Sequence, residues 1–100
     1  MKTEILILNV NTFEKEGQKK SRIGFIFAKK EYLQNTAKFK GYAELSMFYE
    51  NELPFNNIPL EIIGNVVEAT IREVPNVTNP LRKRQVIESI KFKDNVINLL

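Results

Sequence analysis

The clearest strand pattern in the chain is Val66-Val67-Glu68-Ala69-Thr70-Ile71-Arg72-Glu73-Val74. Side chains alternate along an extended strand, so its inner apolar positions share one face: Val67, Ala69 and Ile71. The positions between them are polar: Glu68, Thr70 and Arg72. An apolar face opposite a polar face is typical of an antiparallel strand with one side in the core. The stretch therefore predicts an antiparallel β-fold.

Four further segments have strand composition: Thr3–Phe13, Arg22–Ala28, Tyr42–Tyr49 and Val86–Phe92. Polar or proline-containing segments between them predict loops: Glu14–Ser21, Lys29–Gly41, Glu50–Pro59 and Pro75–Gln85. Two shorter elements complete the pattern, a helical turn over Pro59–Ile63 and a short strand or bulged continuation over Val96–Leu100. No helical crossover joins the strands. We therefore expect an all-β fold, a small five-stranded antiparallel barrel of the OB type with extended hairpin loops.

The size of the chain fits this fold. One hundred residues with 43% hydrophobic content bury one modest core, which predicts a single domain over residues 1–100. The longest apolar run near the N-terminus has four residues, Ile5 to Leu8, which is too short for a secretion signal or a membrane span. We therefore expect a cytoplasmic protein of a bacterial or phage-infected host cell.

The composition excludes several kinds of catalytic site. The chain has no cysteine and no histidine, which excludes disulfides, thiol nucleophiles, zinc sites and serine–histidine catalysis. Carboxylate chemistry needs acids that converge, but Asp94 is the only aspartate and the glutamates of the strands are spread along the chain. The sequence predicts a protein that is not an enzyme and that uses no metal and no cofactor.

Basic residues cluster near the two loops with which OB barrels bind oligonucleotides. Lys19-Lys20-Ser21-Arg22 ends the first loop, and Arg82-Lys83-Arg84 ends the loop between the fourth and fifth strands. The net charge of +3 is mild, so the arrangement of the cations carries more information than their number. We expect both clusters to follow the phosphates of a nucleic acid, along the rim of one groove.

Aromatic residues crowd the middle third of the chain, where they alternate with cations. Unpaired bases stack on exposed aromatic rings, and each stack contributes about 1–3 kcal/mol. Phe25, Phe27 and Phe48 suit the core as well as they suit stacking, because small barrels are filled by large side chains. Tyr32, Phe39 and Tyr42 lie in or beside the lysine-rich connection and are expected to be exposed. The complete predicted nucleic-acid-binding set is Lys19, Lys20, Arg22, Lys29, Lys30, Tyr32, Lys38, Phe39, Lys40, Tyr42, Arg82, Lys83 and Arg84.

The layout of these segments resembles a known family. An apolar N-terminal strand, a polar loop leading into Ser21-Arg22-Ile23-Gly24, a third strand over Tyr42–Tyr49 and two strands around a long loop in Val66–Leu100 cover nearly the whole chain. This arrangement is similar to the short single-stranded DNA-binding proteins of bacteriophages and mobile elements, the family of the filamentous-phage gene V protein. The resemblance implies an OB-type barrel, a symmetric dimer, cooperative binding along single-stranded DNA and protection of replication intermediates. It also implies a binding role for Arg22 and its basic and aromatic neighbours.

The sequence therefore predicts a non-catalytic, sequence-independent single-stranded DNA-binding protein that protects replication or recombination intermediates. RNA remains an open ligand, because the discrimination rests on contacts to the 2′-hydroxyl group. A homodimer is expected, since strand two and Phe55–Ile63 hold more apolar residues than one small core buries. The alternative is a small phage-type interaction or inhibitor module that binds a host protein through a strand edge.

Overall fold

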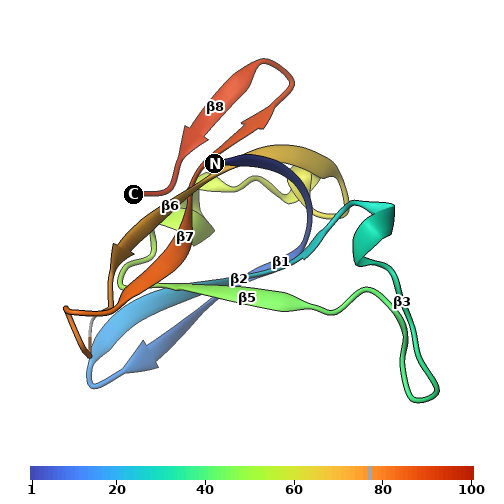
Figure 1. Ribbon diagram of the computed structural model, residues 1–100. Coiled ribbons are helices and arrows are strands. Elements are labelled where there is room, and N and C mark those ends of the chain that lie inside the picture. The colour runs from blue at the N-terminus through green and yellow to red at the C-terminus, as the bar shows by residue number, and fades with distance from the viewer. Residues whose placement is uncertain (77) are drawn as a thin grey trace.

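A computed structural model describes residues 1–76 and 78–100 of the chain. Its elements are, in chain order, β1 (Lys2–Lys15), β2 (Gln18–Phe27), η1 (Lys30–Tyr32), β3 (Gln34–Asn35), β4 (Lys40–Gly41), β5 (Leu45–Tyr49), α1 (Leu53–Asn57), η2 (Leu60–Ile62), β6 (Val66–Pro75), β7 (Lys83–Phe92) and β8 (Asn95–Asn98). Strands dominate and every strand pair is antiparallel, which confirms the predicted fold class (Figure 1). Val77, which belongs to the loop expected over Pro75–Gln85, lies outside the described residues.

The main sheet has six strands in the order β5-β2-β1-β6-β7-β8, and β3 pairs with β4 in a separate two-stranded sheet. Within the main sheet β1, β2 and β5 pair in succession, and β6 then returns to the free side of β1. The resulting order, fourth strand beside first, is that of a Greek key. The sheet ends at β5 and β8 and is not closed, so the expected five-stranded closed barrel is not what the hydrogen bonds form. The prediction also missed β3 and β4 and left β8 open as a bulged continuation.

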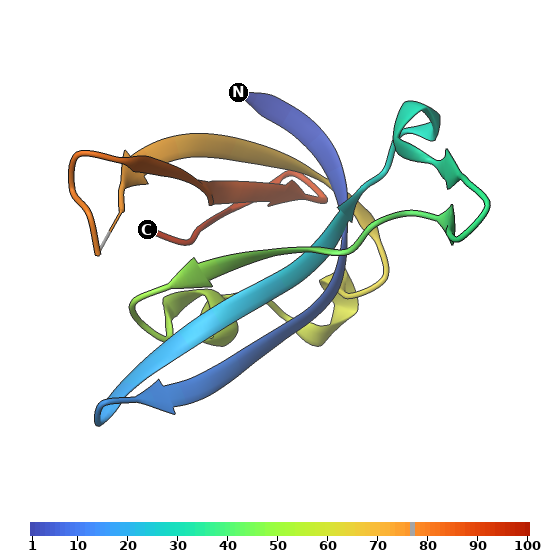
Figure 2. The same ribbon diagram turned by 60° about the horizontal axis from the view of Figure 1, so that its bottom comes forward.

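Strand β1 is long and strongly bent, and it joins the two halves of the sheet (Figures 1 and 2). It pairs with β6 through Lys2–Leu6 and with β2 from Ile5 onwards. The register with β2 shifts between Ile7 and Asn9, so Leu8 is an extra residue in β1. Such a bulge bends the strand and increases its twist. Ile5 and Ile7 remain fully buried, whereas Leu8 is exposed.

The core lies between the halves of the bent sheet. The apolar positions of β6, Val67, Ala69 and Ile71, are buried as predicted. The three phenylalanines that the sequence left open between core and stacking differ in exposure: Phe25 is buried, Phe27 is half-buried and Phe48 is exposed. The buried apolar residues are Ile5, Ile7, Ile23, Phe25, Met47, Tyr49, Ile58, Ile62, Val67, Ala69, Ile71, Val86, Ile87, Ile90 and Leu99.

Two side chains join β5 to β7 where the sheet is open, and we call this junction the seam. The Tyr49 hydroxyl donates to the Ile87 carbonyl oxygen at 2.8 Å and accepts from the Ile87 N–H at 2.9 Å. The Arg84 guanidinium donates to the Phe48 carbonyl oxygen. At the seam, hydrogen bonds from side chains therefore join the two strands, as hydrogen bonds between backbones join the strands elsewhere in the sheet.

The loop expected over Glu14–Ser21 is mostly strand. Glu14 pairs with Lys19 and Lys15 with Gln18, so only Glu16 and Gly17 form the turn. Both turn residues have positive φ, 55° and 77°, as the tight turns of two-residue hairpins require. The prediction failed because both faces of this ribbon meet water between Glu14 and Lys19, so its residues are polar, and the buried Ser21 at its base is polar as well.

Three other predicted segments differ from the structure at their boundaries or in their content. Strand pairing extends to Pro75 opposite Lys83, which leaves 76–82 as the connection in place of the expected Pro75–Gln85. The third strand begins at Leu45 and not at Tyr42, because residues 42–44 form the connection between β4 and β5. The loop expected over Glu50–Pro59 contains α1, whose first turn holds Pro54, where a missing N–H costs no hydrogen bond. The helical turn expected over Pro59–Ile63 is present as η2.

Candidate nucleic-acid interface

The predicted binding residues fall into three groups, which lie at two ends of the molecule. Lys19, Lys20 and Arg22 are on β2 and are called the β2 cations. Residues 29–42, called the lysine arm, hold Lys29, Lys30, Tyr32, Lys38, Phe39, Lys40 and Tyr42. The third group, Arg82, Lys83 and Arg84, spans the end of the β6–β7 loop and the start of β7. The arm projects from one end of the sheet, and the β1–β2 turn and the β6–β7 loop lie at the other (Figures 1 and 2).

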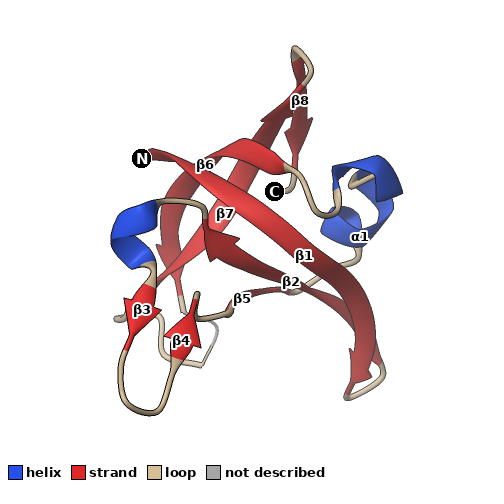
Figure 3. Cartoon of the chain, turned by 90° about the vertical axis from the view of Figure 1, so that its right-hand side faces the viewer, coloured by secondary structure: helices blue, strands red, loops and turns tan. Residues whose placement is uncertain are grey.

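The lysine arm is an ordered protrusion with its own short hairpin. Figure 3 shows β3 and β4 on one side of the sheet and α1 on the other. Thr36 fixes the tip of this hairpin: its N–H donates to the Phe39 carbonyl oxygen at 2.8 Å, and its hydroxyl oxygen accepts from the Phe39 N–H at 3.0 Å. A threonine that bonds the nearby backbone in this way favours a turn. The sequence prediction treated the whole segment as a connection because its strands have only two residues each.

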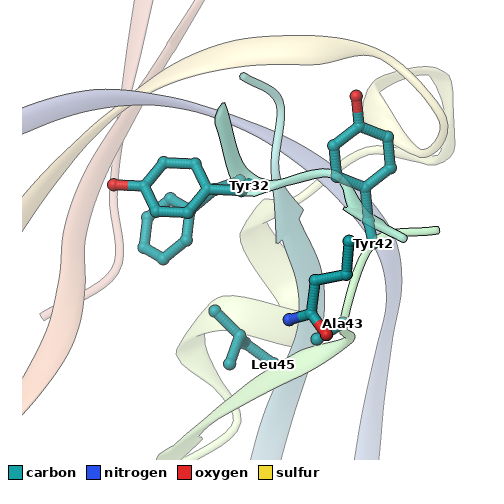
Figure 4. Close-up of a pocket in the computed structure, with 6 residues that line it drawn as sticks. Tyr32, Tyr42, Ala43 and Leu45 are labelled. Carbon is teal, nitrogen blue, oxygen red and sulfur yellow. The ribbon is translucent and has the colours of Figure 1, made fainter. Parts of the chain in front are cut away.

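An apolar pocket lies where the arm joins the sheet, and we call it the aromatic pocket. It encloses about 220 Å³. The Tyr32 ring lies 5.1 Å from the Phe27 ring with 31° between their planes, and Phe27 in turn meets Phe25 edge to face at 5.6 Å. Figure 4 shows Tyr32 and Tyr42 on opposite sides of the opening, with Leu45 below them. The residues lining the aromatic pocket are Phe27, Tyr32, Gln34, Tyr42, Ala43 and Leu45.

Two of the three aromatic residues predicted to stack reach this pocket. Tyr32 is 48% exposed although its ring packs on Phe27, and Tyr42 is half-buried. Phe39 is exposed as expected, but it lies at the hairpin tip and does not line the pocket. The structure therefore brings Tyr32 and Tyr42 together and leaves Phe39 apart.

The lysines of the arm are exposed and free of carboxylate partners. Within residues 1–76 and 78–100, no Asp or Glu oxygen lies within 4.0 Å of the ammonium group of Lys29, Lys30, Lys38 or Lys40. The one acidic residue in the arm is Glu31, in η1. The arm therefore carries both exposed cations and two of the aromatic residues that line the apolar pocket.

The β2 cations are all engaged with glutamates. Lys20 lies 2.5 Å from Glu50, and Lys19 lies 3.9 Å from Glu52. Arg22 is 3.4 Å from Glu44. These contacts could not be read from the sequence, because they depend on how β5 and the segment after it lie beside β2.

Arg22 is held in a wider network on the outer face of the sheet. Its guanidinium donates to the Ser46 hydroxyl at 2.9 Å and to the Asn9 side-chain oxygen at 3.3 Å. Gly24 leaves the room for this network, because a Cβ atom there would lie 2.7 Å from both the Asn9 oxygen and a Glu44 carboxylate oxygen. Arg22 is thus fixed in place on the face of β2.

The third basic group divides in two. Arg82 and Lys83 are exposed, with no acidic partner within 4.0 Å in the described part of the chain. Arg84 is half-buried, donates across the seam, and has a buried Nε atom without a partner among the described residues. Arg84 is therefore a structural contact between strands, which a run of three basic residues did not indicate.

The pairing of two surface aromatic residues was not predicted, and the direction of one of them, Phe48, was left open. Phe13 and Phe48 meet edge to face at 6.2 Å on the outer face of β1, β2 and β5. A hollow of about 190 Å³ opens beside them, and Lys15, Lys20 and Glu50 help to line it. Met47-Phe48-Tyr49 is apolar throughout, so alternation alone did not identify Phe48 as the outward residue. Met47 and Tyr49 are buried in the structure, so Phe48, which lies between them along the strand, points outward.

The described residues hold neither a metal-binding cluster nor a membrane span. They contain no group of three or more acidic side chains arranged to hold a metal ion. Among these same residues, every helix is too short or too polar to cross a bilayer. No family model matches the chain, and neither a curated protein nor a solved structure matches it.

Proposed function

We propose that this protein binds single-stranded DNA without catalysing a reaction, and that the lysine arm and the aromatic pocket are its primary binding site. The observation that carries the proposal is the exposed Tyr32 ring, packed on Phe27 at the mouth of an apolar pocket, on an arm that also carries four exposed lysines. Single-strand binding needs these two components together, aromatic faces for bases and cations for phosphates.

The pocket favours an unpaired base over a duplex. Bases in a duplex stack on one another, so their faces are not free to enter a hollow lined by Tyr32 and Tyr42. Because every base has an aromatic face, stacking gives little sequence preference. The proposed activity is therefore general, consistent with a role in protecting replication or recombination intermediates.

The strand order supports an OB-type arrangement as part of the same proposal. The OB fold is a partly open Greek-key barrel, and here β6 returns beside β1 while side chains alone bridge β5 and β7. The family resemblance to the short phage single-stranded DNA-binding proteins belongs to this proposal as well.

A fluorescence titration with oligo(dT), and with a duplex of equal length, tests the proposal at two salt concentrations. We expect the single strand to bind more tightly and its affinity to fall with salt, because arm lysines release counterions from phosphates. Replacing Tyr32 with leucine should weaken oligo(dT) binding by about 1–3 kcal/mol at unchanged fold.

The matched control is Phe92→Leu, since Phe92 also lies beside a lysine, with the Lys93 ammonium 5.2 Å from its ring centre, but outside the aromatic pocket. This control should bind as the wild type does. Equal losses from both substitutions, or tighter binding of the duplex, would reject the pocket as a base site. Absence of any salt-dependent binding to oligo(dT) would reject the function and favour the interaction-module alternative.

A further inference from the structure

The carboxylate partners of the β2 cations come from one short segment of the chain. Arg22, Lys20 and Lys19 follow β2 outward, and their partners Glu44, Glu50 and Glu52 follow the chain from just before β5 to just before α1. The pairing follows the antiparallel register of the two strands, in which Arg22 lies opposite Phe48 and Ser21 opposite Tyr49. One edge of the sheet thus carries a row of cations, each covered by an acid.

This row differs from the other cations of the predicted site. The arm lysines and the pair Arg82 and Lys83 have no acid within 4.0 Å among the described residues. A protein that binds phosphates would therefore hold two kinds of cationic surface, one open and one covered.

The covering contacts are exchangeable. The glutamate side chains are 36–47% exposed, so water reaches the acidic side of each pair, while the Lys20 and Arg22 side chains are 17% and 28% exposed. Ion pairs that water reaches contribute little to stability. A phosphate makes the same charge-assisted hydrogen bonds to lysine and arginine as a carboxylate does. A phosphate backbone can therefore replace the glutamates at low cost.

The same face also offers aromatic surface. Phe48 lies directly opposite Arg22, and Phe13 directly opposite Lys20, in the registers of β5 with β2 and of β1 with β2. Phe48 is 49% exposed. Lys20 and Arg22 thus share the outer face of the sheet with these aromatic rings, whereas Lys19 alternates onto the other face of β2.

We propose that Glu44, Glu50 and Glu52 occupy, in the free protein, positions that nucleic-acid phosphates take in the complex. The β2 cations, with Lys20 and Arg22 on the outer face, are then a second part of the binding track, which a strand enters only by displacing these carboxylates. This inference rests on the proposed single-strand binding. If the inference holds, the glutamates weaken nucleic-acid binding at this face and also lower the affinity of the face for other anions.

The test replaces all three glutamates together, Glu44→Gln, Glu50→Gln and Glu52→Gln, and repeats the oligo(dT) titration over a range of salt. Removing three competing carboxylates should tighten binding on the order of tenfold at low salt, as expected for three pairs that water reaches. The plot of log affinity against log salt should steepen by up to about 0.7 for each additional phosphate that the freed cations neutralise.

The matched control is the triple change Glu61→Gln, Glu88→Gln and Asp94→Asn. It removes three negative charges, as the first triple variant does. It also removes one ion pair, since Glu88 lies 3.2 Å from Arg72. Circular dichroism and thermal unfolding verify that both triple variants fold. We expect a clearly smaller increase in affinity from the control, because it only adds general attraction.

Equal affinities and slopes for the two triple variants, with the wild type binding oligo(dT), would overturn the inference and leave the proposed function standing. If neither the wild type nor either variant binds oligo(dT) at low salt, the proposed function fails and the inference fails with it. Binding by the wild type that becomes tighter and more salt-dependent in the partner-glutamate variant than in the control variant supports the inference.

Discussion

Tyr49 makes the side-chain hydrogen bonds that join β5 to β7 across the open seam. Its ring is 2% exposed, and its hydroxyl is both donor and acceptor to the backbone of Ile87. Burial raises the pKa of this phenol well above its ordinary value, and the hydrogen bond to Ile87 and the charge of Arg84 only partly oppose the rise. The phenol therefore remains protonated in the folded protein over the ordinary pH range.

Replacing Tyr49 with phenylalanine should destabilise the protein by about 1–3 kcal/mol, because the buried N–H and carbonyl groups of Ile87 lose their partner. Urea unfolding measures the loss. Tyr42→Phe is the control, since the Tyr42 hydroxyl makes no hydrogen bond to the residues described. A loss no larger than that of the control would mean that water replaces the hydroxyl at the seam.

The same pair of proteins has a predicted pH dependence. In the unfolded chain Tyr49 loses its proton near the ordinary pKa of about 10. The folded protein holds the proton to higher pH, so the stability that the phenol contributes is present below about pH 10 and falls above it. The difference in unfolding free energy between wild type and Tyr49→Phe should therefore shrink as pH rises above about 10. A constant difference would contradict this linkage.

Residue roles divide into those that alternation predicts and those that it cannot. The inward positions Val67, Ala69 and Ile71 were predictable, because a polar residue separates each from the next. Phe48 was not, since apolar residues flank it on both sides. The seam contact of Arg84 was equally hidden, because the sequence shows its charge and not the strand that it faces.

At the scale of elements, the two tight hairpin turns place non-glycine residues in the left-handed region. Glu16 has φ 55° in the β1–β2 turn, and Lys93 and Asp94 have φ 48° and 64° in the β7–β8 turn. Left-handed backbone costs an ordinary residue about 1–2 kcal/mol, whereas asparagine and glycine adopt it more easily. These turns are therefore not optimised for stability.

Replacing Glu16 with asparagine should stabilise the protein by about 0.5–1 kcal/mol, because Asn-Gly is the preferred pair for such a turn. Thermal or urea unfolding measures the change. The opposite substitution in the same turn, Gly17→Ala, should destabilise by a similar amount, as Gly17 has φ 77°. If both variants unfold like the wild type, the turn is frayed in solution and its geometry does not limit stability.

Strand ends were harder to predict than strand centres. The polar ribbon 14–21 pairs fully, since a two-stranded hairpin beyond the core needs no apolar face. The arm hairpin of two-residue strands gives no periodic signal, and Thr36 holds its tip through contacts that are local in space. Hence the candidate aromatic residues were identified, while the pocket that joins Tyr32 to Phe27 was not.

Over the whole molecule, the two basic loops that the sequence predicted to share one groove lie at the same end of the sheet, and the lysine arm lies at the other (Figures 1 and 2). Periodicity specifies which way a side chain points along its own strand, but not which loops meet. The expected apolar surplus is present only in part: Phe55 and Leu60, with Leu8 of β1, are exposed around a groove of about 350 Å³, whereas the apolar residues of β2 are buried or half-buried. The homodimer remains a prediction that this surface makes testable.

Leu60 is 86% exposed and is the natural position for the test. If this surface joins two copies, Leu60→Asp should raise the dissociation constant of the dimer at least about tenfold, because it places a charge in an apolar contact. Light scattering over a dilution series measures the change. Leu81→Asp is the control, since Leu81 is 96% exposed on the β6–β7 loop. A monomeric wild type, or equal behaviour of the two variants, would contradict the prediction.

The position of β1 between β2 and β6 determines when the molecule can fold. The hairpins β1–β2 and β6–β7 join neighbours in the chain, and such hairpins form in about 1–10 μs. The contact between them pairs residue 2 with residue 70, so it closes most of the chain into a loop. Contacts of this range slow folding, since the entropy of closure is lost before the contact forms. On the ribosome, β1 therefore waits with its isoleucines uncovered until residues 66–70 emerge, and the core assembles only after most of the protein has been synthesised.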